Sequence, residues 1–217
     1  MESFWILGAG HFGSLAVKRI LQSQRDCNVI VVDHAAEPLD GLRDRDLEII
    51  QKDAIDFLVS QSGLGHEWIV PAIPEHVAFT WLCRKLAEDG KVFRVAVPAE
   101  LELQIPNPLR GKTDSLYTSF ATFRCPDYCD EPEEICTVTG KRRKARLFEL
   151  LQQVKLPGYE IYVVRSNQLE PGVGGYRLSV LWNLLENVRS ADKKVIVCTA
   201  CSCHGVINAL RFDRSAK

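Results

Sequence analysis

Three glycines near the N-terminus have the spacing of a phosphate-binding loop. Gly8, Gly10 and Gly13 form a Gly-x-Gly-x-x-Gly pattern between the apolar run 4–7 and a helical pattern. In such a motif the first glycine permits a tight turn, the second lets the backbone approach a pyrophosphate, and the third lets helix and strand pack closely. The N–H groups at the helix N-terminus then favour phosphate. A structural turn without a ligand is the alternative interpretation.

An acidic residue follows the next predicted strand. The continuously apolar run 27–34 contains Asp33, which lies 20 residues beyond Gly13. A carboxylate at this place can accept hydrogen bonds from the ribose hydroxyls of a dinucleotide, and it would repel a 2′-phosphate. The sequence therefore favours NAD over NADP, although the neighbouring His34 could soften that preference.

The cysteines are a second source of chemistry, because the chain has eight of them. Cys125, Cys129 and Cys136 fall within twelve residues of a polar, proline-containing stretch, and Cys203 belongs to the later sequence CTACSCHG. Thiolates bind zinc or an iron–sulfur cluster, and metal-ligand bonds can replace missing hydrophobic burial in such a stretch. We expect these four cysteines to form a metal site, although their spacing matches no standard signature. A reactive Cys203 thiolate with His204 as its base is the alternative.

The elements that must position these residues alternate between strand and helix. Strand-like runs cover 4–7, 27–34, 47–51, 67–71 and 91–98, with helical patterns after the first, third and fourth of them. This rhythm is typical of βαβ units with a parallel sheet, in which ligand sites lie at the carboxyl ends of the strands. We therefore predict an α/β fold, a three-layer, doubly wound, mostly parallel Rossmann-like sheet with a Cys-rich loop insertion. The glycine loop and the Cys201–His204 turn should both lie at its carboxyl edge.

The pattern changes after Pro98. Residues 99–140 are irregular, and later elements are predicted as a helix at about 141–153, a strand at 159–169, a glycine-rich mobile loop at 170–176, a helix at 177–188, and a strand, turn and helix over 193–212. We predict a dinucleotide-binding domain over 1–98. The region 99–217 is predicted to add the Cys-rich loop and two strand–helix units that extend the same sheet. A separate small second domain is the alternative.

Three stretches of the first hundred residues form a recognisable set: GAGHFG, the strand ending in Asp33, and QKDAIDFL. Over roughly residues 3–98 they resemble the nucleotide-binding domain of potassium-transport regulators, the TrkA-N or RCK type, except that Lys52 replaces the usual glycine before Asp53. The resemblance implies a Rossmann fold that binds NAD or a related adenine nucleotide, with Ala72 and Ile73 on the nicotinamide or ribose side. The Cys-rich half resembles no characterised family. The candidate cofactor-binding residues are Gly8, Ala9, Gly10, His11, Phe12, Gly13, Asp33, His34, Asp53, Ala54, Ala72 and Ile73.

Composition excludes several classes of function. The net charge of −1 argues against a nucleic-acid partner, and no apolar run reaches the ~18 residues of a membrane span. The N-terminus has neither the basic start nor the cleavage site of a signal peptide, so we expect a cytoplasmic protein. We predict an NAD(H)-binding, nucleotide- or redox-sensing protein that also carries zinc or an iron–sulfur cluster. An NAD-dependent oxidoreductase acting on a small acidic substrate is the alternative. A homodimer is expected by analogy with the fold alone.

Overall fold

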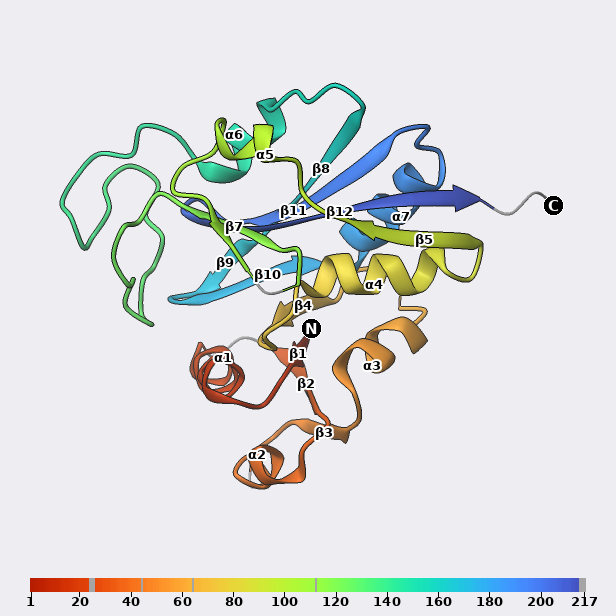
Figure 1. Ribbon diagram of the computed structural model, residues 1–217. Helices are drawn as coiled ribbons and strands as arrows, with labels where there is room; N and C mark the ends of the chain where they lie inside the picture. The colour runs from red at the N-terminus through yellow and green to blue at the C-terminus, as the bar shows by residue number, and fades with distance from the viewer. Residues whose placement is uncertain (24–25, 44, 64, 112, 215–217) are drawn as a thin grey trace.

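The chain forms a mixed α/β structure with two six-stranded sheets (Figure 1). This computed structural model describes residues 1–23, 26–43, 45–63, 65–111 and 113–214. The first sheet has the strand order β3-β2-β1-β4-β10-β9, and its first four strands are parallel. Its strands are β1 (Glu2–Leu7), β2 (Cys27–Asp33), β3 (Glu48–Gln51), β4 (Trp68–Pro71), β9 (Asn167–Glu170) and β10 (Val173–Arg177).

Four helices connect or follow the parallel strands, and the sequence predicts all of them except the short helix at 36–40. They are α1 (His11–Gln22), α2 (Ala36–Asp40), α3 (Ala54–Ser60) and α4 (Val77–Leu86). Local signals fix several of their ends. Asp53 caps α3 by accepting a 2.9 Å hydrogen bond from the Asp56 amide, as Asp commonly does at this position. The basic pair Arg84 and Lys85 in the last turn of α4 complements the negative end of that helix.

The second sheet is the main departure from the prediction. Its order is β6-β7-β12-β11-β8, with β5 also paired to β12. Among its described residues β8 and β11 run parallel, and the other neighbouring strands are antiparallel. The strands 91–98, 159–169 and 193–200 were predicted to continue the first sheet, and that prediction is wrong. The strands are β5 (Gly90–Val95), β6 (Leu109–Arg110), β7 (Leu116–Ser119), β8 (Tyr159–Arg165), β11 (Lys194–Ala200) and β12 (His204–Arg214).

The predicted C-terminal helix is the strand β12. Along it Ile207 and Ala209 face one core, whereas Leu210 faces another, so the strand is buried on both faces. Such a strand has no polar face to mark its period, and a short apolar run of this kind cannot be distinguished from a buried helix by periodicity alone. Its pairing with β11, β5 and β7 decides the outcome.

The glycine-rich segment 170–176 is not a mobile loop but part of the hairpin β9–β10. This hairpin extends the first sheet, with Tyr176 paired to Ile69 of β4. Close backbone approach explains one of its glycines, because a Cβ on Gly175 would lie 2.8 Å from the Ile69 carbonyl oxygen. Tyr176 itself is fully buried in the core.

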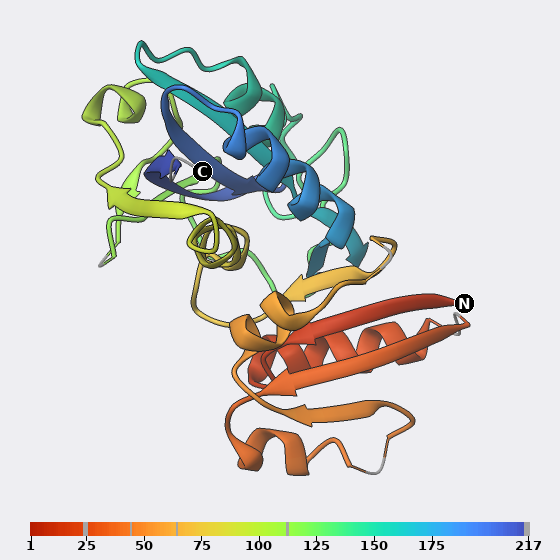
Figure 2. The same ribbon diagram turned by 90° about the vertical axis from the view of Figure 1, so that its right-hand side faces the viewer.

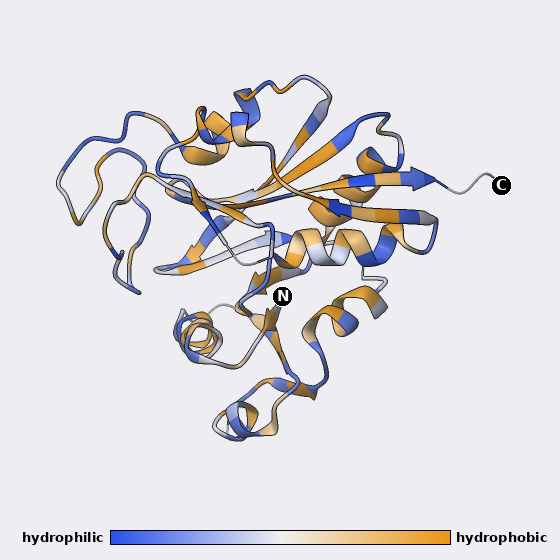
Figure 3. Cartoon of the chain, viewed as in Figure 1, coloured by the Kyte–Doolittle hydropathy of each residue, from blue (hydrophilic) through white to orange (hydrophobic). Residues whose placement is uncertain are grey.

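Three hydrophobic cores hold the layers together. One packs α1 and α2 against the outer face of the first sheet, and another packs α5 (Ala99–Glu102) and α6 (Leu147–Gln153) against the second sheet. The third contains α3, α4 and α7 (Leu178–Arg189) together with inward residues of both sheets, so it joins them. Figure 2 shows α4 and α7 at the junction of the sheets, and Figure 3 shows hydrophobic residues concentrated on the strands.

A buried histidine also links the start of α4 to the second sheet by hydrogen bonds. His76, which precedes α4, donates from Nδ1 to the Asn208 side-chain oxygen of β12 at 2.9 Å and accepts at Nε2 from the Thr199 hydroxyl of β11 at 2.9 Å. Burial lowers the pKa of His76 from its usual 6.5 to about 4, against a smaller opposing effect of Asn208. The folded protein therefore holds a neutral imidazole at neutral pH.

His76 should make the protein less stable in acid. As the pH falls from 6.5 to about 4, the unfolded chain binds a proton at this residue and the folded chain does not. The free energy of unfolding should fall by about 3 kcal/mol over that interval from this residue. Urea denaturation at pH 7 and pH 4 should show a smaller difference in His76→Gln than in the unchanged protein. Equal differences in the two proteins would contradict the assignment.

Candidate functional site

The first glycine of the motif is required by the backbone. Gly8 ends β1 with φ of 108°, a conformation that side chains rarely adopt, and its amide donates to the Val32 carbonyl at 2.7 Å. A Cβ there would lie 2.8 Å from the Ala72 carbonyl oxygen and 2.9 Å from Ile73 Cγ2. The turn after β1 therefore lies directly against the end of β4. This places the predicted residues Ala72 and Ile73 beside the glycine loop.

The other two glycines differ sharply from each other. A Cβ on Gly13 would lie 1.9 Å from the Gly8 carbonyl oxygen, so this glycine lets α1 pack onto the end of β1. Gly10 is exposed, its φ of −66° suits any residue, and no atom lies within 4 Å of where its Cβ would be. Packing within the protein therefore gives no reason for a glycine at position 10. The residue leaves the N-terminus of α1 open, with no side-chain cap on that helix.

The predicted acidic residue lies against this loop. Asp33 Oδ2 accepts from the Ala9 amide at 2.8 Å, and Oδ1 accepts from the Ala35 amide at 2.9 Å. Its side chain is 12 % exposed, and His34 Nδ1 lies 3.3 Å from Oδ1. The carboxylate is therefore held in place by backbone amides at the edge of the glycine loop, with an exposed histidine beside it.

The remaining predicted contact residues lie at the start of α3 and within the glycine loop itself. Asp53 caps α3, and Ala54 is buried in the core that joins the sheets. His11 and Phe12, on the first turn of α1, are exposed, and their rings meet edge to face with centroids 5.1 Å apart. These residues have structural contacts of their own, and contact with a nucleotide remains a prediction for each of them.

Four cysteines from distant parts of the chain line one cavity of about 330 Å3. Cys125, Cys129 and Cys136 come from the irregular segment 120–146, and Cys203 comes from the turn between β11 and β12. The sequence predicted these same four as a group. Among the described residues, however, no three histidine, cysteine or acidic side chains are arranged to hold a metal ion as they stand.

The thiols of this cavity influence one another. Burial raises the pKa of Cys125, and the neighbouring Cys129, Cys203 and Cys136 raise it further. A negative charge on one sulfur therefore disfavours a negative charge on Cys125. In the absence of a cation, this arrangement favours the protonated thiol at that position.

The basic run 141–144 lines the same cavity and does not begin a helix. The predicted helix from about 141 starts only at Leu147, where α6 begins. Within this run the Arg143 guanidinium donates to Cys203 Sγ, and its Nε donates to the Pro132 carbonyl at 2.6 Å. Arg143 therefore faces Cys203, whereas Lys141, Arg142 and Lys144 are exposed at the rim of the cavity.

His204 contacts sulfurs other than the one for which it was a candidate base. Its Nε2 lies 3.6 Å from Cys125 Sγ and its Nδ1 lies 3.9 Å from Cys201 Sγ. Cys201 Sγ also accepts from the amides of Cys203 at 3.4 Å and His204 at 3.3 Å. Burial raises the pKa of Cys201 to about 12 and lowers that of His204, so both are neutral at neutral pH.

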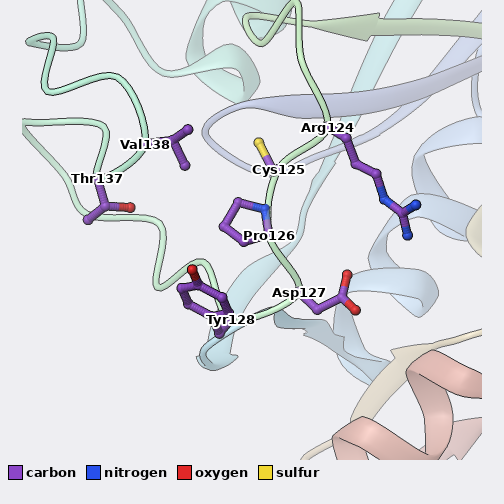
Figure 4. A pocket seen from close by; sticks show the side chains of 7 residues that line it. All are labelled: Arg124, Cys125, Pro126, Asp127, Tyr128, Thr137 and Val138. Carbon is purple, nitrogen blue, oxygen red and sulfur yellow. The ribbon is translucent and has the colours of Figure 1, made fainter.

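The irregular segment 120–146, called the cysteine segment below, is hydrogen-bonded to the start of α1. Asp127, which lies between Cys125 and Cys129, accepts from His11 Nε2 at 2.8 Å through Oδ2, and its carbonyl accepts from Arg19 at 2.6 Å. The hydrogen bond to His11 lowers the pKa of Asp127. In Figure 4 Asp127 extends away from Thr137 and Val138, on the side where α1 lies.

The β9–β10 hairpin holds the other side of this segment. The Gly172 amide donates to the Cys129 carbonyl at 2.7 Å, and Gln168 Nε2 donates to the same oxygen at 3.0 Å. Gly172 has φ of 68°, and a Cβ there would lie 1.8 Å from the Asp127 carbonyl oxygen. Sequence reasoning missed Asp127 and Arg19, because a lone aspartate or arginine carries no signal of a partner more than a hundred residues away.

A larger cavity of about 600 Å3 lies between the two candidate sites. Phe12 of the glycine loop lines one part of it, and Cys201, Cys203 and His204 line another. The two turns that were predicted at one sheet edge therefore belong to different sheets, yet they border the same cavity.

The described helices include none with the length and apolarity that crossing a bilayer requires.

Comparison with known proteins shows the family. The family AF_1314_C, described as "Uncharacterized protein, C-terminal domain", matches residues 78–213, which is more than half of the chain, and the protein belongs to it. This region begins within α4 and contains all four cysteines of the 330 Å3 cavity. The chain is also 30 % identical over 224 residues to an uncharacterized protein of Archaeoglobus fulgidus, covering 95 % of this chain and 98 % of the relative. No solved structure matches the chain significantly.

Proposed function

We propose that the glycine loop binds NAD(H) and that the protein uses this nucleotide as a regulatory ligand, in nucleotide or redox sensing. The observation that carries the proposal is Gly10. It has open space where a side chain would lie, at the uncapped N-terminus of a twelve-residue helix. A glycine that packing does not require is explained by a ligand that must approach the backbone.

Two features of the fold support the same conclusion. The parallel order β3-β2-β1-β4 is that of the first half of a Rossmann fold, in which the first βα turn holds the pyrophosphate. The resemblance of residues 3–98 to the nucleotide-binding domains of potassium-transport regulators points to the same ligand. On this proposal the amides that begin α1 hold the phosphates, Asp33 receives the adenosine ribose, and the nicotinamide side extends toward Ala72 and Ile73.

A sensing role is supported by the contacts at the start of α1. His11 lies in the proposed phosphate loop and bonds Asp127 of the cysteine segment. Arg19, on the same helix, bonds the Asp127 carbonyl, and the Gly172 turn abuts it from the other side. A phosphate group arriving at the His11 amide brings negative charge near the Asp127 carboxylate. Nucleotide binding should therefore change how the cysteine segment is held.

A substitution of Asp33 tests both whether NADH binds and whether NADH is preferred over NADPH. Asp33→Asn keeps one oxygen for the Ala9 amide but removes the charge, and NADH affinity should fall about tenfold, as expected for the loss of a charge-assisted hydrogen bond. NADPH affinity should rise relative to NADH affinity. Titration of nucleotide fluorescence measures both, with Asp40→Asn, an exposed carboxylate of α2, as the control. An unchanged ratio would mean that Asp33 does not face the ribose.

One observation favours an oxidoreductase as a second candidate. The 600 Å3 cavity beside Phe12 is also lined by Arg124 and His204, a cation for a carboxylate and a titratable imidazole. We infer that such a cavity could admit a small acidic carbonyl compound beside the glycine loop. Oxidation of NADH in the presence of a panel of 2-oxo acids tests this activity, and turnover would favour it over sensing.

A further inference from the structure

We propose that Cys125, Cys129, Cys136 and Cys203 bind one metal centre with all-thiolate coordination. Zinc and an iron–sulfur cluster share this ligand chemistry. The proposal rests on the cavity of about 330 Å3 that all four residues line, and it does not depend on nucleotide binding. The chain brings these residues together from two separate segments, 120–146 and the β11–β12 turn, with Cys125 and Cys203 78 positions apart.

The surrounding charge fits an anionic centre. Four thiolates with a divalent metal leave a net negative charge, and Lys141, Arg142, Arg143 and Lys144 line the same cavity. Arg143 donates directly to Cys203 Sγ. Hydrogen bonds of this kind to ligand sulfurs stabilise a bound centre and tune its properties. A bound metal ion would offset the mutual repulsion of four thiolates that line one cavity.

The backbone around Cys136 supports a ligand role for this sulfur. A bridge between Ile135 and Arg142 closes a short turn, in which the Gly140 amide donates to the Cys136 carbonyl at 2.8 Å. The side chain and amide of Thr139 also hydrogen-bond to Cys136 within this turn. The turn therefore fixes the place of this sulfur beside the cavity, as hydrogen bonds around metal-binding cysteines do.

The segment that carries three of the ligands has little structure of its own. Between β7 and α6 the described residues form no helix and only the bridge at Ile135. It is tied at Asp127 and Cys129 to α1 and to the β9–β10 hairpin. These anchors hold the cysteines near Cys203, and the irregular backbone lets the sulfurs draw together around a metal. Metal-ligand bonds then supply stability that hydrophobic burial does not.

Metal content of the full chain tests the proposal. The protein is purified without oxygen, and zinc, iron and acid-labile sulfide are measured together with the visible spectrum. We expect about one zinc per chain, or iron with a matching amount of sulfide and visible absorbance. Cys136→Ser and Cys203→Ser should each lower the metal content about tenfold or more. Cys27→Ser, a change in β2 far from the cavity, should leave it unchanged, and so should His204→Ala.

A second measurement separates lost binding from lost folding. Circular dichroism identifies variants that remain folded. In addition, the unmutated protein is stripped of metal with a chelator, and Co2+ added to it should give the strong charge-transfer absorbance of thiolate coordination. Full metal content in folded Cys136→Ser or Cys203→Ser would overturn the assignment. So would metal-free protein that gives no charge-transfer absorbance with Co2+, or loss of the metal in His204→Ala as complete as in Cys136→Ser.

Discussion

Gly10→Val is expected to weaken NADH binding by about a hundredfold or more while the melting temperature changes by only about 3 °C. The valine side chain would enter space in which the protein has no atom within 4 Å, so the fold can accept it. The same side chain would occupy the place where we propose that phosphate approaches the amides of α1. A hundredfold loss corresponds to about 2.7 kcal/mol of binding free energy. Fluorescence titration and a thermal melt of the same preparation give both values.

The matched control is a glycine at the other end of a helix. Gly41 follows α2 with φ of −67°, and a Cβ there would meet only the Pro38 carbonyl oxygen, at 3.9 Å. Gly41→Val should therefore bind NADH as the unchanged protein does. If Gly10→Val keeps its affinity, or if the unchanged protein has none, the motif is a structural turn between β1 and α1 and the proposed function is wrong.

The first part of the fold could be predicted because its signals are local. A continuous apolar run such as β2 needs helices on both faces of the sheet, and the chain supplies them in sequence order. The glycine pattern marks the start of α1, and Asp53 marks the start of α3. Each of these signals lies within a few residues of the element that it defines. Pairing then follows from the short right-handed connections of βαβ units.

The second sheet could not be predicted in this way, because its signals are equally local but ambiguous. The strand β5 follows α4 as a fifth parallel strand would, and only its antiparallel pairing with β12, more than a hundred residues later, places it in the other sheet. The glycines at 172–175 suit a mobile loop or a closely packed hairpin. The choice depends on the position of Ile69 and Asp127, which local sequence does not contain.

The residues of the candidate sites also fall into two groups, those that local sequence predicts and those that depend on distant contacts. The glycine loop with Asp33, and the four cysteines, could be proposed from residue type and spacing, since each type has few other uses in that pattern. Arg143 and Asp127 could not, because an arginine in a basic run and an aspartate in a polar loop are ordinarily solvated. Their roles arise only when the segment 120–146 lies against α1 and the β11–β12 turn.

Gly13→Ala should destabilise the protein strongly, for a reason unrelated to any ligand. The added methyl group would lie 1.9 Å from the Gly8 carbonyl oxygen, a backbone atom that cannot rotate away, so α1 must shift from the end of β1. Overpacking of this kind costs typically 1–3 kcal/mol and occasionally more, and a backbone clash belongs at the upper end, at about 3 kcal/mol. For a chain of this size, that loss corresponds to a fall in melting temperature of roughly 6–12 °C.

Gly10→Ala is the control for this prediction, because it adds the same methyl group three residues earlier, in open space. It should lower the melting temperature only slightly, through the poorer propensity of alanine at a helix N-cap. The two alanine variants together separate the roles of the glycines. Gly13 is required by the packing of α1 whether or not a nucleotide binds, and so a destabilised Gly13→Ala carries no information about function. If Gly13→Ala melts at the same temperature as the unchanged protein, the close approach of α1 to β1 is wrong. The place proposed for the phosphates is then wrong as well.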